Sequence, residues 1–383
     1  MPIQQTVSAV CFFKVPIFFA VCLFKFPAIS FNDRIRRGYM MIQLYGTMGP
    51  NCQTQDVFTS MLMEGMAGIR LNLSHSSLEN SRSTIDAYSE ACRSLHVPMK
   101  LMIDMHGPEQ RTGSRETPLF LHQEEEVVLA NDTCCNSSSE INVSPLILNS
   151  LELHDHVLLQ DGLIELEVMQ AKHQICASSE APSFQCRVLR GGTLRSHQSV
   201  KICDKEVYGP VLTLEDLHHL DLAGQAGVTA VMQPFVRRGE DILAVRSALQ
   251  ERHIQADIFA KIESHEGIEH LDSIIQYADV IVIARGDLGN SMPLWELPAI
   301  QKKIAAQCIA AHRPFMVVTQ LLHSMIHSPV PTRAEVSDIY NSVLDGASYL
   351  MVTGETAVGQ YPVQVMHYLS KTVEEAEKHL ALN

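Results

Sequence analysis

Basic residues are in the minority in this chain of 383 residues. Its 29 lysines and arginines stand against 43 aspartates and glutamates, which gives a formal net charge of −14. A nucleic-acid surface is therefore not expected, because contacts with phosphates along a polynucleotide require a basic stripe. The charge does not exclude small anionic substrates, since a local cluster of Arg, Lys and metal ions can bind them.

Cysteine patterns of metal sites and disulfide frameworks are also missing. The ten cysteines are scattered singly except for Cys134 and Cys135, and no CxxC pair or Cys/His ligand spacing occurs. Such scattered cysteines are typical of reduced thiols in the cytoplasm. A zinc site built from the histidines is not expected. The only tryptophan, Trp295, is expected to serve packing rather than a cofactor.

A long hydrophobic run is absent, even from the unusual first forty residues. The uninterrupted apolar stretch from Val15 to Phe24 is too short to span a bilayer. Met40 and Met41 stand directly before the first strand pattern, so a start assigned too far upstream is our leading interpretation of residues 1–40. A targeting segment and a membrane anchor are the alternatives. We exclude residues 1–40 from the fold and expect no membrane contact for the folded part.

From residue 41 onward, short apolar runs alternate with amphipathic stretches. The strand patterns lie at 42–48, 68–73, 100–104, 228–232, 257–262, 280–283, 316–319 and 349–352. Strands that alternate with helices predict parallel βαβ units. Eight such units predict a closed (β/α)8 TIM barrel. An open doubly wound sheet is the second choice, because no G-x-G-x-x-G opens a helix.

The alternation is interrupted after the third strand. Residues 117–207 lack helical periodicity and contain strand-like runs between Ser, Asn, Gly and Pro clusters. This composition predicts a separate, mostly β unit inserted into the barrel. We place the barrel at 41–113 and 208–383 and the inserted unit, called the β module, at 114–207.

Polar residues cluster at the carboxyl ends of the predicted strands, where TIM barrels carry their catalytic and binding residues. The main ones are Arg70, Asn72, Ser74, Asp104, Lys261, Glu263, Asp287 and Thr319. Glu263 and Asp287 are carboxylates on adjacent strands, the oxygen ligands that Mg²⁺ takes. Arg70 and Lys261 supply positive charge suited to a phosphoryl group. Lys261 and Glu263 are two residues apart, so both project to the same face of a strand.

Three further polar residues could supply oxygen ligands: Asn72, Ser74 and Asp104. Only one of them, Asp104, carries a carboxylate. That composition suits a monovalent cation or a plain hydrogen-bond network, and the spacing does not choose between them.

The sequence resembles the pyruvate kinase family over about residues 41–380. The matching strings are TMGPN at 47–51, EGMAGIRLNLSH at 64–75, GPEQRTG at 107–113, QDGLIELEV at 160–168, AKIESHEGI at 260–268, ARGDLG at 284–289, PTRAEVSDI at 331–339, VLDGA at 343–347 and TGETAVGQYP at 353–362. One string alone is weak, but the joint pattern is specific. The resemblance implies a cytoplasmic glycolytic kinase that converts phosphoenolpyruvate and ADP to pyruvate and ATP. It also implies a homo-oligomer that associates through barrel helices.

The resemblance implies a role for each matching position. Lys261 would stabilise the transition state, Arg70 would hold the phosphate, and Glu263 and Asp287 would bind Mg²⁺. Gly286, Asp287 and Thr319 would contact the enolpyruvate.

K⁺ would be bound by Asn72, Ser74, Asp104 and the main-chain oxygen of Met105, with Glu109 accompanying K⁺ dependence. Arg111, His75 and Asn51 would face the nucleotide. The β module would close over the site, with Asp161 facing the cleft.

Several positions depart from the family pattern. Met105 and His106 replace the common Thr-Lys, Gln198 replaces a lysine near the nucleotide, and Pro234 replaces a serine. The chain ends at Asn383, where relatives continue into an allosteric domain, so we expect no sugar-phosphate activation. Two alternatives follow: a binding or regulatory protein with impaired turnover, and a Mg²⁺-dependent lyase or aldolase barrel acting on enolpyruvate chemistry.

Overall fold

Eight parallel strands close into a barrel in the computed structural model, which describes residues 42–131, 139–160, 162–172, 182–203, 205, 207 and 209–382. The order around the barrel is β1-β16-β15-β14-β13-β12-β3-β2. The strands are β1 (Gln43–Thr47), β2 (Met66–Asn72), β3 (Leu101–Asp104), β12 (Val228–Gln233), β13 (Asp257–Ile262), β14 (Val280–Ala284), β15 (Phe315–Val318) and β16 (Tyr349–Met351). The predicted TIM barrel is thereby confirmed, with every strand within two residues of its expected place.

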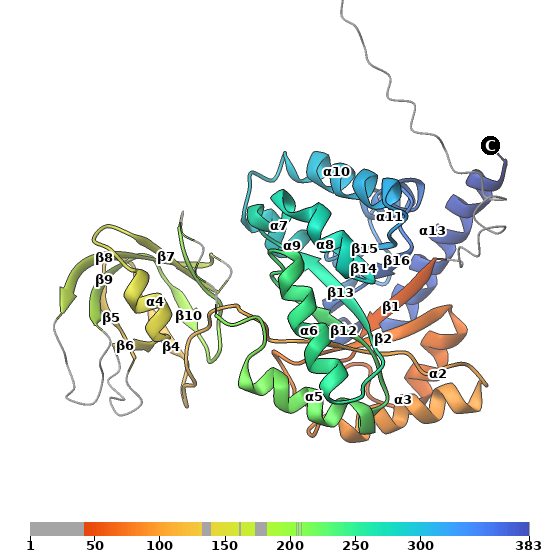
Figure 1. Cartoon of the computed structure of the whole chain (residues 1–383), viewed down its shortest axis with the longest axis horizontal. Coiled ribbons are helices and arrows are strands. Elements are labelled where there is room, and N and C mark those ends of the chain that lie inside the picture. The colour runs from red at the N-terminus through yellow and green to blue at the C-terminus, as the bar shows by residue number, and fades with distance from the viewer. Residues whose placement is uncertain are drawn as a thin grey trace, which may run out of the picture.

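Helices surround this barrel (Figure 1). The longer ones are α2 (Gln55–Met63), α3 (Arg82–Ser94), α5 (Leu214–Ala226), α6 (Gly239–Glu251), α10 (Leu297–Ala310), α11 (Arg333–Leu344) and α13 (Pro362–Leu382). The shorter ones are α7 (His265–Glu269), α8 (Leu271–Tyr277), α9 (Arg285–Asn290), η1 (His323–Ile326) and α12 (Gly354–Ala357). Thr213 caps α5 in a capping box with Asp216, and Gly227 ends that helix at φ 72°.

Two layers of apolar side chains hold the barrel together. Side chains alternate along a strand, so one set fills the barrel interior and the other packs under the helices. On β13, Phe259 belongs to the inner cluster, and Ile258, Ala260 and Ile262 belong to the outer one. The inner position that follows Phe259 is Lys261. The strand pleat therefore directs this lysine toward the barrel axis.

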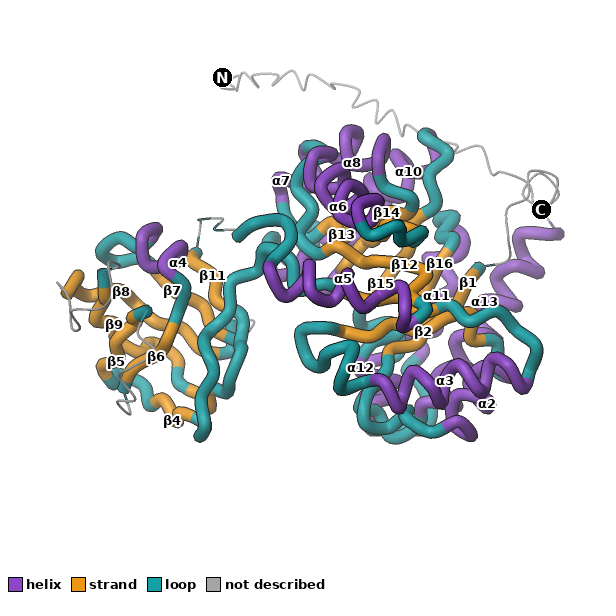
Figure 2. The backbone as a smooth tube through the Cα atoms, turned by 60° about the horizontal axis from the view of Figure 1, so that its bottom comes forward, coloured by secondary structure: helices purple, strands orange, loops and turns teal. Residues whose placement is uncertain are grey.

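The β module lies between β3 and α5 and forms a separate body beside the barrel (Figures 1 and 2). Its larger sheet has the order β11-β7-β8-β9-β5-β6 and its smaller sheet pairs β10 with β4. These strands are β4 (Leu119–Leu121), β5 (Glu126–Ala130), β6 (Glu140–Asn142), β7 (His156–Leu159), β8 (Ile164–Lys172), β9 (Ser183–Arg190), β10 (Gly192–Leu194) and β11 (Val200–Ile202), with the short helix α4 (Pro145–Ser150). The module has its own apolar core.

The two chain segments that connect the module to the barrel run side by side. The Thr112 amide donates to Gln198 O at 2.8 Å, and the Val200 amide donates to Gln110 O at 2.8 Å. Further toward the barrel, the Gly209 amide donates to Pro108 O at 2.9 Å. Pairing between the outgoing and the returning segment thus begins before residue 114.

Trp295 and Asp161 differ from expectation or cannot be compared with it. The Trp295 side chain is 81% exposed, so the expectation that it serves packing was wrong. It lies in the segment between α9 and α10, where the described residues leave it open to solvent. Asp161, expected to face the cleft, lies outside the described residues.

Candidate active site

The candidate site occupies the inward-facing positions at the carboxyl ends of the barrel strands. Leu71 and Ile103 belong to the outer core, so the alternating positions Arg70, Asn72 and Asp104 face inward. Asn72 and Asp104 are partners in the β2–β3 register. Polar side chains more than thirty residues apart in the sequence therefore share one end of the barrel.

Asp104 is the centre of a buried ion-pair network. Arg70 donates to its Oδ2 from Nη2 at 2.5 Å and from Nε at 2.8 Å. The Lys261 ammonium lies 3.5 Å from both carboxylate oxygens. Because Asp104 is only 2% exposed, a buried carboxylate of this kind requires such partners. It holds both predicted phosphate-binding cations at a fixed place.

Glu263 is the second buried carboxylate. It is 2% exposed, and its Oε2 accepts the Phe235 amide at 2.9 Å. Its Oε1 lies 3.1 Å from the Lys261 ammonium, yet no described group donates a hydrogen bond to this oxygen. Burial raises the pKa of Glu263 to about 7, against the attraction of Lys261 and with the help of Asp287. One buried oxygen is thus left with unused capacity to bind a cation.

Lys261 keeps its charge in this environment. Burial alone would lower the pKa of its ammonium, but Asp104 and Glu263 outweigh that effect and raise it. Asp287 has a separate partner, since the Lys201 ammonium of the β module lies 3.4 Å from its Oδ1. The opening for a cation is therefore at Glu263 Oε1, which accepts no hydrogen bond from the described residues.

Asp287, Gly286 and Thr319 lie on the neighbouring strand ends. Asp287 is in the first turn of α9, directly after β14, and its side chain is 31% exposed. A Cβ added at Gly286 would lie 3.1 Å from Thr319 Cγ2, so glycine permits the close approach of these two positions. Thr319 has φ 80°, an uncommon backbone conformation for a β-branched residue.

Arg285 fixes that backbone. Its Nε and Nη2 donate to Thr319 O at 3.2 and 2.7 Å, and its Nη1 pairs with Asp338 at 2.6 Å. The guanidinium therefore links β14 to the loop after β15. Glu335 completes a capping box with Thr332 at the start of α11, which is a structural role.

The predicted K⁺ ligands are close in space, but some of them already form hydrogen bonds with other groups of the protein. Asn72 Oδ1 accepts the Ser74 amide at 3.2 Å, and Asp104 accepts from Arg70. The Met105 side chain packs into the outer core, and its amide donates to Met232 O at 3.0 Å. Their role in K⁺ binding stays a prediction.

The three predicted nucleotide residues occupy different surroundings. His75 lines a cavity of about 500 Å³ together with Arg70, Asn72 and Thr47. Arg111 pairs with Glu109 at 2.5 Å and donates to His197 O at 3.0 Å, at the base of the β module.

Asn51 does not line that cavity. Its Nδ2 donates to Val358 O at 2.8 Å and to Gly359 O at 2.9 Å. Its amide group therefore stabilises the loop after α12. A direct contact with a nucleotide stays a prediction for each of these three residues.

Lys201 was missed by the sequence analysis. On β11 its neighbours Val200 and Ile202 point into the module core, so Lys201 points the other way, toward the barrel. Its ammonium lies 3.4 Å from Asp287 Oδ1 and 5.4 Å from the centre of the Phe235 ring. The alternation was visible in the sequence, but the resemblance directed attention to Gln198, whose Nε2 donates to Ser196 O at 2.8 Å within the module.

A second cavity, of about 490 Å³, separates the module from the barrel. Glu109, Lys201, Phe235 and Glu263 contribute to its walls. Glu109 is buried there, which raises the pKa of its carboxyl despite Arg111. Buried acids and a lysine thus face a space large enough for a small anionic ligand with its cation.

Comparison with known proteins agrees with this geometry. The sequence profile of the pyruvate kinase barrel domain matches residues 40–366. The chain belongs to the pyruvate kinase family. The pyruvate kinase of Bacillus licheniformis is 33% identical over 340 residues, which cover 87% of this chain and 57% of that relative. Pyruvate kinase 2 of Saccharomyces cerevisiae is 33% identical over 353 residues, with 88% and 68% covered.

The crystal structure of a pyruvate kinase from Cryptosporidium parvum also matches, with a TM-score of 0.76 and 30% identity over 89% of this chain and 70% of that one. The family resemblance noted in the sequence and the barrel with an inserted β module are confirmed. The chain spans a little more than half the length of several pyruvate kinases that it matches, such as the one from B. licheniformis. No helix in the described ranges has the length and apolar composition of a membrane span.

Proposed function

We propose that this chain transfers a phosphoryl group from phosphoenolpyruvate to ADP. The bond between phosphorus and the enol oxygen breaks, a terminal ADP oxygen takes the phosphoryl group, and the remaining enolate is protonated at carbon to give pyruvate. The observation that carries the proposal is the position of Lys261, whose ammonium lies 3.1 Å from Glu263 Oε1 and 3.5 Å from Asp104. A fixed cation there can stabilise charge that develops on the transferring group.

Mg²⁺ fits the carboxylates of this site. Glu263 Oε1 is buried and accepts no hydrogen bond from the described residues, and Asp287 presents a partly exposed carboxylate nearby. These two residues would hold Mg²⁺, which takes oxygen ligands and keeps several waters or substrate oxygens. When bound, the ion neutralises charge on the phosphoryl oxygens.

The remaining residues would bind and orient the substrates. Arg70 is anchored on Asp104, which presents its guanidinium toward a phosphate in the cavity it lines. Gly286 and Thr319 would contact the enolpyruvate, with Arg285 holding the Thr319 backbone. Lys201 would bring a positive charge from the β module to the phosphates.

Nucleotide and K⁺ contacts follow the family pattern in this proposal. His75, Arg111 and Asn51 would face ADP, and Asn72, Ser74, Asp104 and the Met105 main-chain oxygen would bind K⁺. Assembly into a homo-oligomer through barrel helices, and a cytoplasmic location, belong to the same proposal.

A binding protein with impaired turnover is the second candidate. Gln198, which replaces a family lysine and remains hydrogen-bonded within the module, favours it. A lyase acting on enolpyruvate or aldol chemistry is less well supported, because the match extends through the inserted β module.

A coupled assay with phosphoenolpyruvate, ADP, Mg²⁺ and K⁺ tests the proposal. We expect ATP and pyruvate in equal amounts, with activity lost on removal of Mg²⁺. Saturable phosphoenolpyruvate binding without ATP formation would support the binding protein and overturn the kinase.

A further inference from the structure

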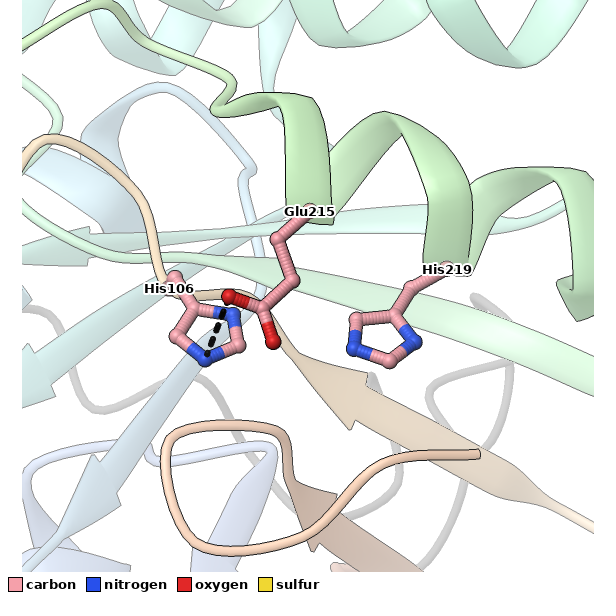
Figure 3. Close-up of side chains that lie close together, drawn as sticks. All are labelled: His106, Glu215 and His219. Atoms are coloured by element: carbon pink, nitrogen blue, oxygen red, sulfur yellow. Dashed lines mark ion pairs between the residues drawn. The ribbon is translucent and has the colours of Figure 1, made fainter. Parts of the chain in front are cut away.

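We propose that His106, Glu215 and His219 form a binding site for a divalent transition-metal ion, with Zn²⁺ as the ion they suit best. The three side chains come together at the barrel end of the β-module connections (Figure 3). One ligand atom from each lies within 4.8 Å of the others. This cluster shares no residue with the Mg²⁺ site proposed above.

Two elements bring the three residues together. Glu215 and His219 are four positions apart on α5 (Leu214–Ala226), so both lie on the same helical face. His106 follows β3 on the segment that leaves the barrel. Its Nε2 lies 3.8 Å from Glu215 Oε2, and its ring stacks on that of His219 with 6.0 Å between ring centres and 8° between ring planes.

His219 is the observation that points most strongly to a ligand. Its side chain is almost fully buried, at 1% exposure, and neither ring nitrogen has a hydrogen-bond partner in the described part of the chain. Glu79 Oε2 lies 4.0 Å from Nδ1, beyond hydrogen-bond reach. Leaving a buried polar group unpaired lowers the stability of the folded chain.

The neighbouring Asp216 orients His106. His106 Nδ1 lies 3.6 Å from Asp216 Oδ1, and the His106 amide donates to the same oxygen at 2.7 Å. Histidines that bind metals commonly turn their second ring nitrogen toward a carboxylate. The side of the ring that carries Nε2 then faces Glu215.

The ligand types and the spacing suit Zn²⁺. Two imidazoles and one carboxylate are a known zinc ligand set, with water in the fourth position. Ligand atoms about 2.1 Å from one tetrahedral ion lie roughly 3.4 Å apart, close to the 3.8 Å between His106 and Glu215. Glu215 is 63% exposed, so its side chain can move the remaining distance toward His106, and water can reach the ion. Mg²⁺ prefers oxygen ligands and is not expected here.

An ion at this place would join the two connections of the β module. His106 lies on the outgoing segment, and Glu215 lies in the first turn of the helix that follows the returning one. The two segments already meet where the Gly209 amide donates to Pro108 O. A metal bridge between them would restrain the module relative to the barrel.

Zinc titration of the full-length protein, by isothermal calorimetry in excess Mg²⁺, tests the site. We expect wild type to bind one equivalent of Zn²⁺ that Glu215→Gln and His106→Gln each weaken by about 10–100-fold or more. The wild-type complex with Co²⁺ should show the strong visible absorption of tetrahedral Co²⁺, and both variants should lose it.

His367→Gln is the control, because His367 on α13 pairs with Glu64 at 2.8 Å and shares no partner with the cluster. It should keep wild-type affinity. Equal Zn²⁺ affinity in wild type, Glu215→Gln and His106→Gln would overturn the proposal, as would a wild type without this one-equivalent site. Both results are independent of phosphoryl transfer, since neither assay contains phosphoenolpyruvate or ADP.

Discussion

The Lys261 ammonium lies 3.1 Å from Glu263 Oε1, and the two residues lie at alternate positions at the end of β13. The pleat of a strand places such residues on one face. The same ammonium lies 3.5 Å from Asp104 on β3. One cation is therefore shared by two buried carboxylates, and this arrangement governs both charge and geometry at the barrel mouth.

Magnesium binding should depend on pH through Glu263. The raised pKa of about 7 means that a proton competes with the ion at lower pH. We expect the Mg²⁺ affinity to fall by up to about tenfold per pH unit below pH 7. Calorimetric titration with Mg²⁺ between about pH 6 and pH 8 measures this affinity. Glu266→Gln is the control, because Glu266 pairs with Arg238 instead. An affinity that stays constant over this range would contradict the assignment.

The raised pKa of Glu263 affects the stability of the metal-free protein in the opposite direction: a rise in pH favours Mg²⁺ binding but lowers the free energy of unfolding. The folded protein binds the Glu263 proton more tightly than the unfolded chain, whose ordinary value is 4.5. The stability that Glu263 contributes is complete below pH 4.5 and is lost as the pH rises toward 7. Mg²⁺ should reverse this loss.

Lys201 should contribute to nucleotide binding from the β module. Its ammonium lies 3.4 Å from Asp287 Oδ1, so a phosphate chain beside that carboxylate would meet a positive charge. We expect Lys201→Gln to raise the KM for ADP about fivefold, equivalent to ~1 kcal/mol, with a smaller effect on kcat.

Lys205→Gln is the comparison, since Glu152 and Asp155 within the module already neutralise that ammonium. If the two variants raise the KM for ADP equally, Lys201 has no specific role.

Gly286→Ala should disturb the enolpyruvate contacts. The added methyl group would lie 3.1 Å from Thr319 Cγ2 and displace that side chain. We expect the KM for phosphoenolpyruvate to rise about tenfold, because small displacements in a site are costly. Gly224→Ala on α5 is the control: its new Cβ meets nothing within 4 Å, and it should stabilise the helix by about 0.5–1 kcal/mol. Unchanged kinetics in Gly286→Ala would show that Gly286 and Thr319 do not contact the enolpyruvate.

Asp216 should be essential for the stability of the module connection. Its carboxylate accepts the amides of Thr213, His106 and Gly107 at 2.9, 2.7 and 3.1 Å. Asp216→Ala leaves these donors unpaired and removes the half of the capping box that the Asp216 side chain supplies. We expect the free energy of unfolding to fall by about 3 kcal/mol in urea denaturation.

Asp221→Ala on the same helix offers a matched comparison. It breaks only an exposed pair with Arg252 and should cost less than about 1 kcal/mol. Similar losses in both variants would mean that the Asp216 contacts are not the cause.

The barrel could be predicted from the sequence because the hydrophobic pattern of each strand is local to that strand. The run from Asp257 to Ile262, for example, is a local feature, and it forms a strand where predicted. Lys261 and Glu263 are also related locally, two residues apart. The positions facing the barrel axis therefore followed from alternation alone.

Contacts between distant segments were not predictable in this way. Asp104 and Lys261 are 157 positions apart, and Lys201 reaches Asp287 from another sheet. The exposure of Trp295 and the meeting of His106 with His219 likewise depend on the path of the connecting segments. A Glu and a His four positions apart, at 215 and 219, were the only local sign of the second metal site.

The steady-state kcat for ATP formation in Lys261→Met, set beside Lys302→Met, tests the central claim most directly. Lys302 forms an exposed ion pair with Asp345 far from the site, so its variant should retain the wild-type rate. Loss of the buried ammonium should lower kcat by at least about 10³-fold, with both proteins folded by circular dichroism. Wild-type turnover that survives in Lys261→Met, or a wild type that forms no ATP, would contradict the account.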